Sequence, residues 1–303
     1  MSQVEPWKSS AVNELQTQPA VLSRLHAAFY LHGVSHRILA ARYIIAILTT
    51  AAATTVAIAG VSTSLMAWLG GAGTVVVSVV TVVGQNRTEM GAKVQDEFDR
   101  AVYGLVRPDT SSQFSIEAVI RWSDKYQGPS RQDWYADVCG LPRSYGALLC
   151  QRQNLQWDGP LRATWVNANI TALSVWIVAG LVVAIEGDWT VRDLGRLWLL
   201  PGLSLPVLLI LVIYNNRRVI QAKAALAIRV SQILSTVPSG PQNSLTDQDD
   251  NLLMGEVESI QQQITALRAK AGRVPNWMFQ RRQARDQVAT TRAVNEIVRR
   301  IRT

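Results

Sequence analysis

Arginines and tryptophans recur between residues 113 and 165 and form the clearest chemical pattern in this chain of 303 residues. A guanidinium group binds phosphate through two parallel hydrogen bonds, and an indole ring stacks on a nucleobase. The pattern therefore indicates a site for an anionic nucleotide. The candidate binding residues are Arg121, Arg131, Arg143, Arg152, Arg162 and Trp157. The plainer alternative is that basic residues on the inner side of a membrane simply follow the positive-inside rule.

Patterns typical of catalysis or metal binding are missing from the sequence. No phosphate loop, dinucleotide-binding, nucleophile-elbow or zinc-protease motif occurs. The acids of the 113–165 segment are not paired with a histidine or a second carboxylate at a catalytic spacing, so we expect structural ion pairs. Cys139 and Cys150 do not have a zinc spacing, and His32 and His36 share a helix face without a third ligand. We expect no enzymatic activity, no metal and no cofactor.

The stretch Leu148–Trp165 joins this polar segment to an uncharged run. Gly159 and Pro160 interrupt any preceding helix, and Asp158 or Gly159 can cap the next helix with Pro160 in its first turn. Arg162 then lies where membrane proteins place basic residues that contact lipid headgroups. We expect this stretch to couple a polar sensor to the membrane. The candidate coupling residues are Asn154, Asp158 and Pro160.

Four apolar runs of 18 to 20 uncharged residues predict the fold class. They are Tyr43–Val61, Leu65–Val83, Val166–Ile185 and Leu197–Tyr214. A helix needs about 20 apolar residues to cross the hydrocarbon core of a bilayer. We therefore expect an all-α membrane protein with four transmembrane helices as two hairpins, a cytoplasmic helical insert and cytoplasmic C-terminal helices. Pro201 and Pro206 predict a kinked fourth helix.

The expected parts follow from these runs. They are a cytoplasmic N-terminal arm at 1–42, hairpin 1 at 43–83, a cytoplasmic helical region at 84–165, hairpin 2 at 166–214, and a cytoplasmic tail at 215–303 with a linker at 236–251. With this topology, Arg192 and Arg196 are the only basic residues of 30 on the outer side. The positive-inside rule then places both termini in the cytoplasm.

Small and hydroxyl residues form stripes along the first two runs. The candidate pore-lining residues are Thr50, Thr54, Thr74, Ser78 and Thr81. Such stripes usually let helices pack closely, and packing is the alternative to a pore wall here. No charged residue lies inside the runs, which disfavours a transporter with a coupling-ion site.

Helical spacing also predicts structure outside the runs. The N-terminal arm contains a helix that lies on the inner leaflet or packs on the rest of the protein. The second run is expected to continue out of the membrane as a helix through residues 94–105. Short helices are expected at 116–120, after a Ser115 cap, and at 131–139. A heptad repeat over 253–267 predicts an oligomer contact or packing on a neighbouring helix. Residues 273–303 hold eight arginines against two acids, a basic face for solvent, anionic lipid, an acidic partner or a nucleotide.

A resemblance to a known family rests on one string of residues. It consists of Trp134-Tyr135, Leu141-Pro142, Cys150-Gln151-Arg152, Asn154, Trp157-Asp158 and Leu161-Arg162. This string, with the order of the apolar runs, resembles the SMODS-associating four-transmembrane effectors over roughly residues 37–229. The resemblance implies a pore-forming effector of bacterial antiphage defence. It would oligomerise in the lipid bilayer of the bacterial inner membrane in response to a cyclic nucleotide. The resemblance also implies a partner nucleotidyltransferase encoded nearby, and no catalytic residues. The rival interpretation is a membrane scaffold that presents basic helices to a partner.

Overall fold

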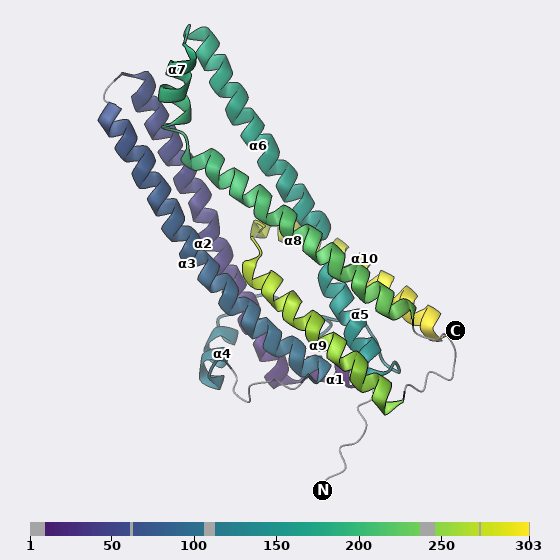
Figure 1. The fold of residues 1–303 in the computed structure, drawn as a ribbon. Helices are drawn as coiled ribbons and strands as arrows, with labels where there is room; N and C mark the ends of the chain where they lie inside the picture. Colours follow the sequence, from purple (N-terminus) through teal and green to yellow (C-terminus); the bar gives the residue numbers. More distant parts are fainter. Residues whose placement is uncertain (1–9, 61–62, 106–112, 237–245, 273, 303) are drawn as a thin grey trace.

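The computed structural model describes residues 10–60, 63–105, 113–236, 246–272 and 274–302, and within these ranges the chain is helical with no strand. The molecule is elongated (Figure 1). One end consists of long helices alone, and the other end is a bundle to which the shorter helices are added. We call these the apolar half and the body. The predicted all-α membrane class is confirmed, because three helices, or four with one bent pair, are long and apolar enough to cross a bilayer.

Two uninterrupted helices form the first hairpin. α2 (Pro19–Ile58) and α3 (Thr63–Tyr103) each start or end in the body, so the transmembrane runs and the helices beside them are continuous. At 40 and 41 residues they are each about 60 Å long. Glycines allow their close approach: a Cβ atom at Gly73 would lie 2.7 Å from Thr49, and one at Gly84 would lie 2.6 Å from Leu39.

The second hairpin contains a broken helix. α6 (Gly159–Glu186) leads to α7 (Val191–Asp193), the π-helical turn η1 (Leu194–Leu199) and α8 (Ser204–Ser235), with a bend of 78° between the last two parts. Pro201 lies in the break, where it cannot donate a helical hydrogen bond, so the kink predicted there is confirmed. Pro206 causes no second break, because it lies in the first turn of α8.

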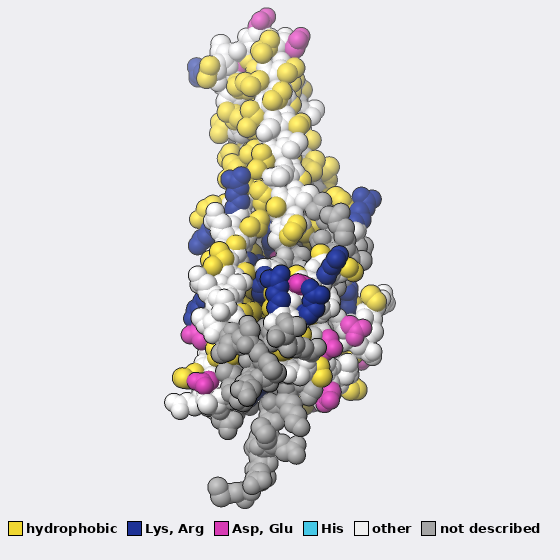
Figure 2. Space-filling view, turned by 90° about the vertical axis from the view of Figure 1, so that its right-hand side faces the viewer, with side chains coloured by type: hydrophobic (Ala, Val, Ile, Leu, Met, Phe, Trp, Pro, Cys, Tyr) yellow, Lys and Arg dark blue, Asp and Glu magenta, His cyan; other side chains and the backbone are white. Residues whose placement is uncertain are grey.

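Side-chain character follows this division into two parts. In Figure 2 hydrophobic side chains dominate the apolar half, and Lys and Arg side chains gather just below it. Exposed Val178, Val182 and Ile185 on α6 and Val75 and Val79 on α3 belong to the apolar surface. An exposed band of this kind is expected where lipid replaces water as the solvent.

The body contains one end of the long helix α3 and five further helices. These are α1 (Ser10–Thr17), α4 (Ile116–Ser123), α5 (Arg143–Gln156), α9 (Asp247–Lys270) and α10 (Asn276–Arg302). Its core contains the fully buried side chains of Phe98, Leu148 and Ile260. The heptad repeat of α9 packs on α3 and α5 within the chain, so the packing alternative is confirmed for it. Leu25 and Leu31 of α2 are also buried, which confirms packing rather than a leaflet position for the N-terminal arm.

Some local predictions are wrong. Residues 131–139 form turns and extended segments instead of a helix, because Trp134 and Tyr135 are used in tertiary contacts. The described end of the predicted linker is helical from Asp247, where the Thr246 hydroxyl accepts from the Asp249 amide as an N-cap. Residues 237–245 lie outside the described ranges. The Ser115 cap is confirmed by its hydrogen bond from the Ala118 amide.

Candidate functional site: a cationic aromatic chamber

A cavity of about 1050 Å³ lies in the body where the helices of the apolar half enter it. Four parts of the chain enclose it: α2 over residues 29–43, the 125–134 segment, the α5–α6 junction at 157–165, and the α9–α10 connection with its flanks at 268–279. α8 adds Lys223. We call this cavity the chamber. Its volume is at the upper end of the range for small-molecule pockets, so it can take a ligand larger than a mononucleotide.

The wall of the chamber carries an excess of positive charge. Among the described residues of the lining, Asp158 is the one acid. The cationic residues are Arg37, Lys125, Arg131, Arg162, Lys223 and Arg268. A concave site lined by charges of one sign concentrates ions of the opposite sign. The chamber is therefore suited to an anionic ligand.

Aromatic rings form much of the remaining wall. Trp157 contacts Phe279 and Trp134 edge-on, with ring centroids 5.3 and 6.2 Å apart, and Trp134 contacts Phe29 at 5.3 Å. The Arg131 guanidinium lies 5.0 Å from the Phe29 ring. Rings of this kind stack on planar bases, and cations beside them bind phosphate.

Asp158 joins two cations at the inner wall of the chamber. Its carboxylate accepts from Arg162 Nε at 2.7 Å and from Lys223 Nζ at 2.6 Å. We call these three residues the Asp158 cluster. Burial would raise the pKa of the Asp158 carboxyl, but the charges of Arg162 and Lys223 outweigh burial and hold the pKa below its ordinary value. Burial lowers the pKa of Lys223 to about 8, and the Asp158 charge only partly opposes this.

Arg162 connects this cluster to two more elements. Its Nη1 atom donates to Asn216 Oδ1 of α8 at 2.9 Å and to the Gly272 carbonyl of the α9–α10 connection at 2.6 Å. The predicted headgroup contact of Arg162 is therefore wrong, because the residue is 5 % exposed and its Nε and Nη1 atoms donate inside the protein. Asp158 occupies the N-cap position of α6, but its carboxylate binds these cations instead of the helix amides.

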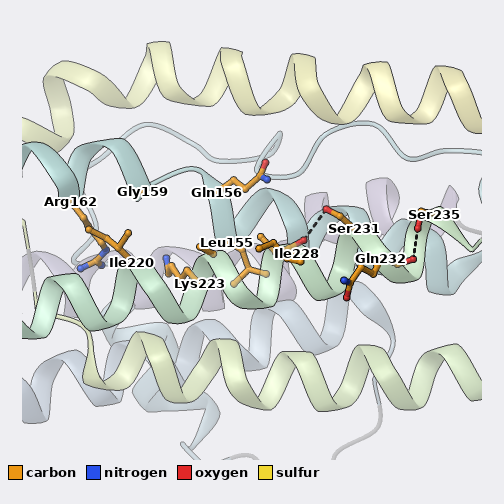
Figure 3. A pocket seen from close by; sticks show the side chains of 12 residues that line it. Leu155, Gln156, Gly159, Arg162, Ile220, Lys223, Ile228, Ser231, Gln232 and Ser235 are labelled. Carbon is orange, nitrogen blue, oxygen red and sulfur yellow. Dashed lines mark hydrogen bonds between the residues drawn. The ribbon is translucent and has the colours of Figure 1, made fainter.

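A second cavity borders the same cluster from the other side. It has a volume of about 680 Å³ and runs between α5 and α8. We call this second cavity the groove. Figure 3 shows Arg162 and Lys223 at one end of this groove and Ser231, Gln232 and Ser235 of α8 at the other. Arg162 and Lys223 line both cavities. The Asp158 cluster thus separates the chamber from the groove.

The predicted binding residues do not form one site. Arg131, Arg162 and Trp157 line the chamber. Arg143 donates to the carbonyls of Tyr103 and Gly104 at the end of α3. Arg152 donates to Ser231 Oγ at 3.2 Å, and Arg121 is exposed on α4 and absent from the chamber lining.

The predicted coupling residues are placed close to the chamber. Asp158 belongs to its wall, and Pro160 is in the first turn of α6. Asn154 donates to the Tyr135 hydroxyl at 2.6 Å, and that hydroxyl donates to Asp99 Oδ1 at 2.6 Å. Asp99 also accepts from Gln261 and from Arg268, and we call these residues the Asp99 cluster.

Lys223 and Arg268 were missed by the sequence reasoning. Arg268 had a detectable signal, because Val257, Gln261, Ile264 and Arg268 lie on one face of α9 with two polar residues among apolar ones. The face of such a helix must bury the polar residues with partners. Lys223 had no comparable signal, because its partner is 65 residues away in the sequence.

The predicted pore residues fall into two groups. Thr50 is buried and bonded to the 202–204 segment, with its hydroxyl 3.1 Å from Ser204 Oγ, and Thr54 is half-buried. Thr74 and Ser78 are exposed on α3, and Thr81 is half-buried. Each of these three hydroxyls donates to the carbonyl one turn earlier. In the single chain, the Thr50 side of α2 and the exposed side of α3 do not face a common space.

These features define a class of protein: a multi-span helical membrane protein with a cationic chamber at the base of its apolar helices. The chain belongs to the family of the SMODS-associating 4TM effector domain, whose family model matches residues 10–297. The searches of curated proteins and of solved structures found no match.

Proposed function

We propose that this protein is a pore-forming effector of bacterial antiphage defence in the inner membrane. A cyclic nucleotide, made by a partner nucleotidyltransferase, binds the body, and the protein oligomerises and permeabilises the bilayer. The proposed activity is binding and permeation rather than catalysis. The family supports an effector that works with a SMODS system. The observation that carries the proposal is the position of the chamber, with its six cations, at the base of helices that continue into the apolar half.

The charge distribution supports an orientation with both termini in the cytoplasm. Basic side chains gather at the boundary between the apolar half and the body (Figure 2). The far end of the apolar half carries Arg192 and Arg196 in α7 and η1. The positive-inside rule places the more basic boundary, and with it the chamber, on the cytoplasmic side. A soluble nucleotide made in the cytoplasm then has direct access to the body.

The exposed hydroxyls of α3 are the proposed lining of the pore. Thr74 and Ser78 are polar residues on an otherwise apolar, exposed surface of α3. In a single chain this surface would face lipid. In an oligomer with α3 toward the central axis, they would instead face the lumen together with Thr81. Thr50 is not assigned to the lumen, because its hydroxyl already contacts Ser204.

Planar-bilayer recording tests the pore. Purified protein is recorded with a panel of cyclic di- and trinucleotides, and Ser78→Trp is compared with Val79→Trp. Both positions are exposed, so neither variant should change the amount of protein in the membrane. A Trp in the lumen narrows the pore, and Ser78→Trp should lower the conductance by about half or more, while Val79→Trp should leave it near the wild-type value.

The recordings also distinguish the alternatives. Equal conductance of the two variants would remove the α3 stripe from the pore wall. The wild type is also recorded after extraction from cells that express the partner nucleotidyltransferase. A lack of conductance in this sample and with every nucleotide of the panel would favour the scaffold.

A further inference from the structure

The Asp158 cluster has one negative and two positive charges, although all three side chains are buried. A buried charge is costly unless an opposite charge compensates it. Asp158 compensates one of the two cations. The cluster therefore keeps an excess positive charge at the wall shared by the chamber and the groove.

Hydrogen-bond donors at this wall are also unused. Among the described residues Lys223 Nζ donates to Asp158 alone, which leaves its other N–H groups without an acceptor. Arg162 uses Nε and Nη1, and its Nη2 has no acceptor in the same part of the chain. Arg268 donates to Asp99 through Nη1, while its Nη2 is buried without a partner among those residues.

These donors come from three different elements. Arg162 is on α6, Lys223 on α8 and Arg268 on α9, and all three line the chamber. Lys223 is 7 % exposed, so its free donors are held in a fixed place rather than on a mobile surface side chain. A phosphate has oxygen acceptors on several sides and can accept from more than one of these donors at once.

A second group of cations lies across the aromatic wall. Arg131 lies over Phe29, and Lys125 lies 5.9 Å from the Tyr30 ring. The ring contacts from Phe29 through Trp134 to Trp157 lead from this group to the residue before Asp158. The wall thus consists of a group of cations, a row of aromatic rings in edge-on contact, and a second group of cations. This order matches a ligand with phosphates on either side of a base.

We propose that the chamber binds a nucleotide with at least two phosphates, and that one phosphate completes the Asp158 cluster by bonding to Lys223 and Arg162. This assignment rests on the proposed function and adds the ligand class and its anchor. The bound phosphate neutralises the excess charge and joins α6 to α8. Both helices continue into the apolar half, so binding draws their bases together directly below the membrane.

Isothermal titration of the purified full chain tests the anchor. The probes are cyclic di- and trinucleotides of adenosine, guanosine and uridine, with 3′,5′-cyclic AMP as the single-phosphate comparison. Lys223→Met keeps the Asp158–Arg162 pair balanced and should weaken binding by about 10- to 100-fold, the loss expected for a charge-assisted hydrogen bond. Arg131→Gln, at the other cationic group, should weaken it by a similar factor.

Arg121→Gln is the matched control, because Arg121 is exposed and outside the chamber. Its affinity should equal that of the wild type. Each variant is first checked for an unchanged elution volume and for cooperative thermal unfolding. Should Lys223→Met not fold, Lys223→Gln and the Arg131 variant carry the test.

Four outcomes decide the proposal. Wild-type affinity in the Lys223 and Arg131 variants overturns the anchor. Equal affinity for cyclic AMP and the larger probes overturns the requirement for two phosphates. In a third outcome, the wild type binds none of the probes in nanodiscs of neutral lipid, yet is stabilised by phosphatidylglycerol in a way that the Lys223 variant is not. This result assigns the site to a lipid headgroup and overturns the assignment of a nucleotide ligand. Binding that requires Lys223 but produces no conductance upholds the site and overturns the pore instead.

Discussion

The body contains two buried carboxylate clusters that differ in balance. In the Asp99 cluster one carboxylate meets one cation, Arg268, and two neutral donors, Tyr135 and Gln261. In the Asp158 cluster one carboxylate meets two cations. The first lies inside the core between α3 and α9, and the second lies between two cavities. The charges are thus balanced one to one in the Asp99 cluster, while the Asp158 cluster keeps an extra cation that can bind an anion.

Neighbouring groups support the structural role of the Asp99 cluster. Burial, followed by the Asp99 charge, raises the pKa of Tyr135 well above its ordinary value. Burial likewise raises the pKa of the Cys150 thiol, which lies in the same core. Both shifts favour the neutral forms of the Tyr135 hydroxyl and the Cys150 thiol, as expected of groups that pack in a core.

Removing one cation from each cluster should produce the largest difference. Arg268→Met leaves Asp99 buried without a counter-charge and should lower the free energy of unfolding by about 3–5 kcal/mol. Lys223→Met leaves the Asp158–Arg162 pair and should cost about 1 kcal/mol. Thermal unfolding in one detergent measures both, with a difference in melting temperature of about 10 °C expected. Equal losses would show that the two clusters are both structural.

A double substitution should give an intermediate effect. Asp158→Asn leaves Arg162 and Lys223 as buried charges of the same sign, and adding Lys223→Met removes one of them. The double variant should therefore be more stable than Asp158→Asn alone by about 1–3 kcal/mol. Chemical denaturation of the three variants and the wild type completes the cycle. Additive losses would mean that the two side chains are not coupled, against the 2.6 Å contact.

The smallest expected effect is on the pH dependence of binding. Lys223 faces Asp158, Arg162 and Arg268, and its pKa of about 8 means that it loses its proton as the pH rises from 7 to 9. An anionic ligand prefers the protonated form, so nucleotide affinity should fall above pH 8 by at most about tenfold per pH unit. Titrations at pH 7, 8 and 9 measure the fall. The same fall in Lys223→Met would assign it to another group.

The membrane architecture could be predicted from the sequence because it depends on local composition. Runs such as Val166–Ile185 have the length and the lack of charge that a bilayer requires. The break at Pro201 is equally local, because proline lacks the amide hydrogen. The 131–139 segment was mispredicted because Trp134 and Tyr135 have partners in distant helices, and helical spacing does not show those contacts.

The residue types of the site could be predicted from the sequence, but which residues of these types come together in it could not. Arg131, Trp157 and Arg162 were selected by residue type, and they do line the chamber. Arg143 is of the same type but binds the end of α3, since a guanidinium serves carbonyls as well as phosphates. The difference between these arginines arises from tertiary structure. No spacing in the sequence distinguishes them.

The continuity of α2 and α3 has a mechanical consequence. Each is a single rod of about 60 Å, stiffened by a glycine seam and fixed in the body at one end. The part of α2 from the chamber wall near residue 36 to Ile58 is about 33 Å long, so a tilt of about 5° at the chamber displaces its far tip by about 3 Å. The second hairpin differs from these rods, because the helix is interrupted by the bent connection between η1 and α8 at its outer end. In the proposed mechanism, a small contraction around a bound ligand would therefore become a larger movement at the far tip of α2.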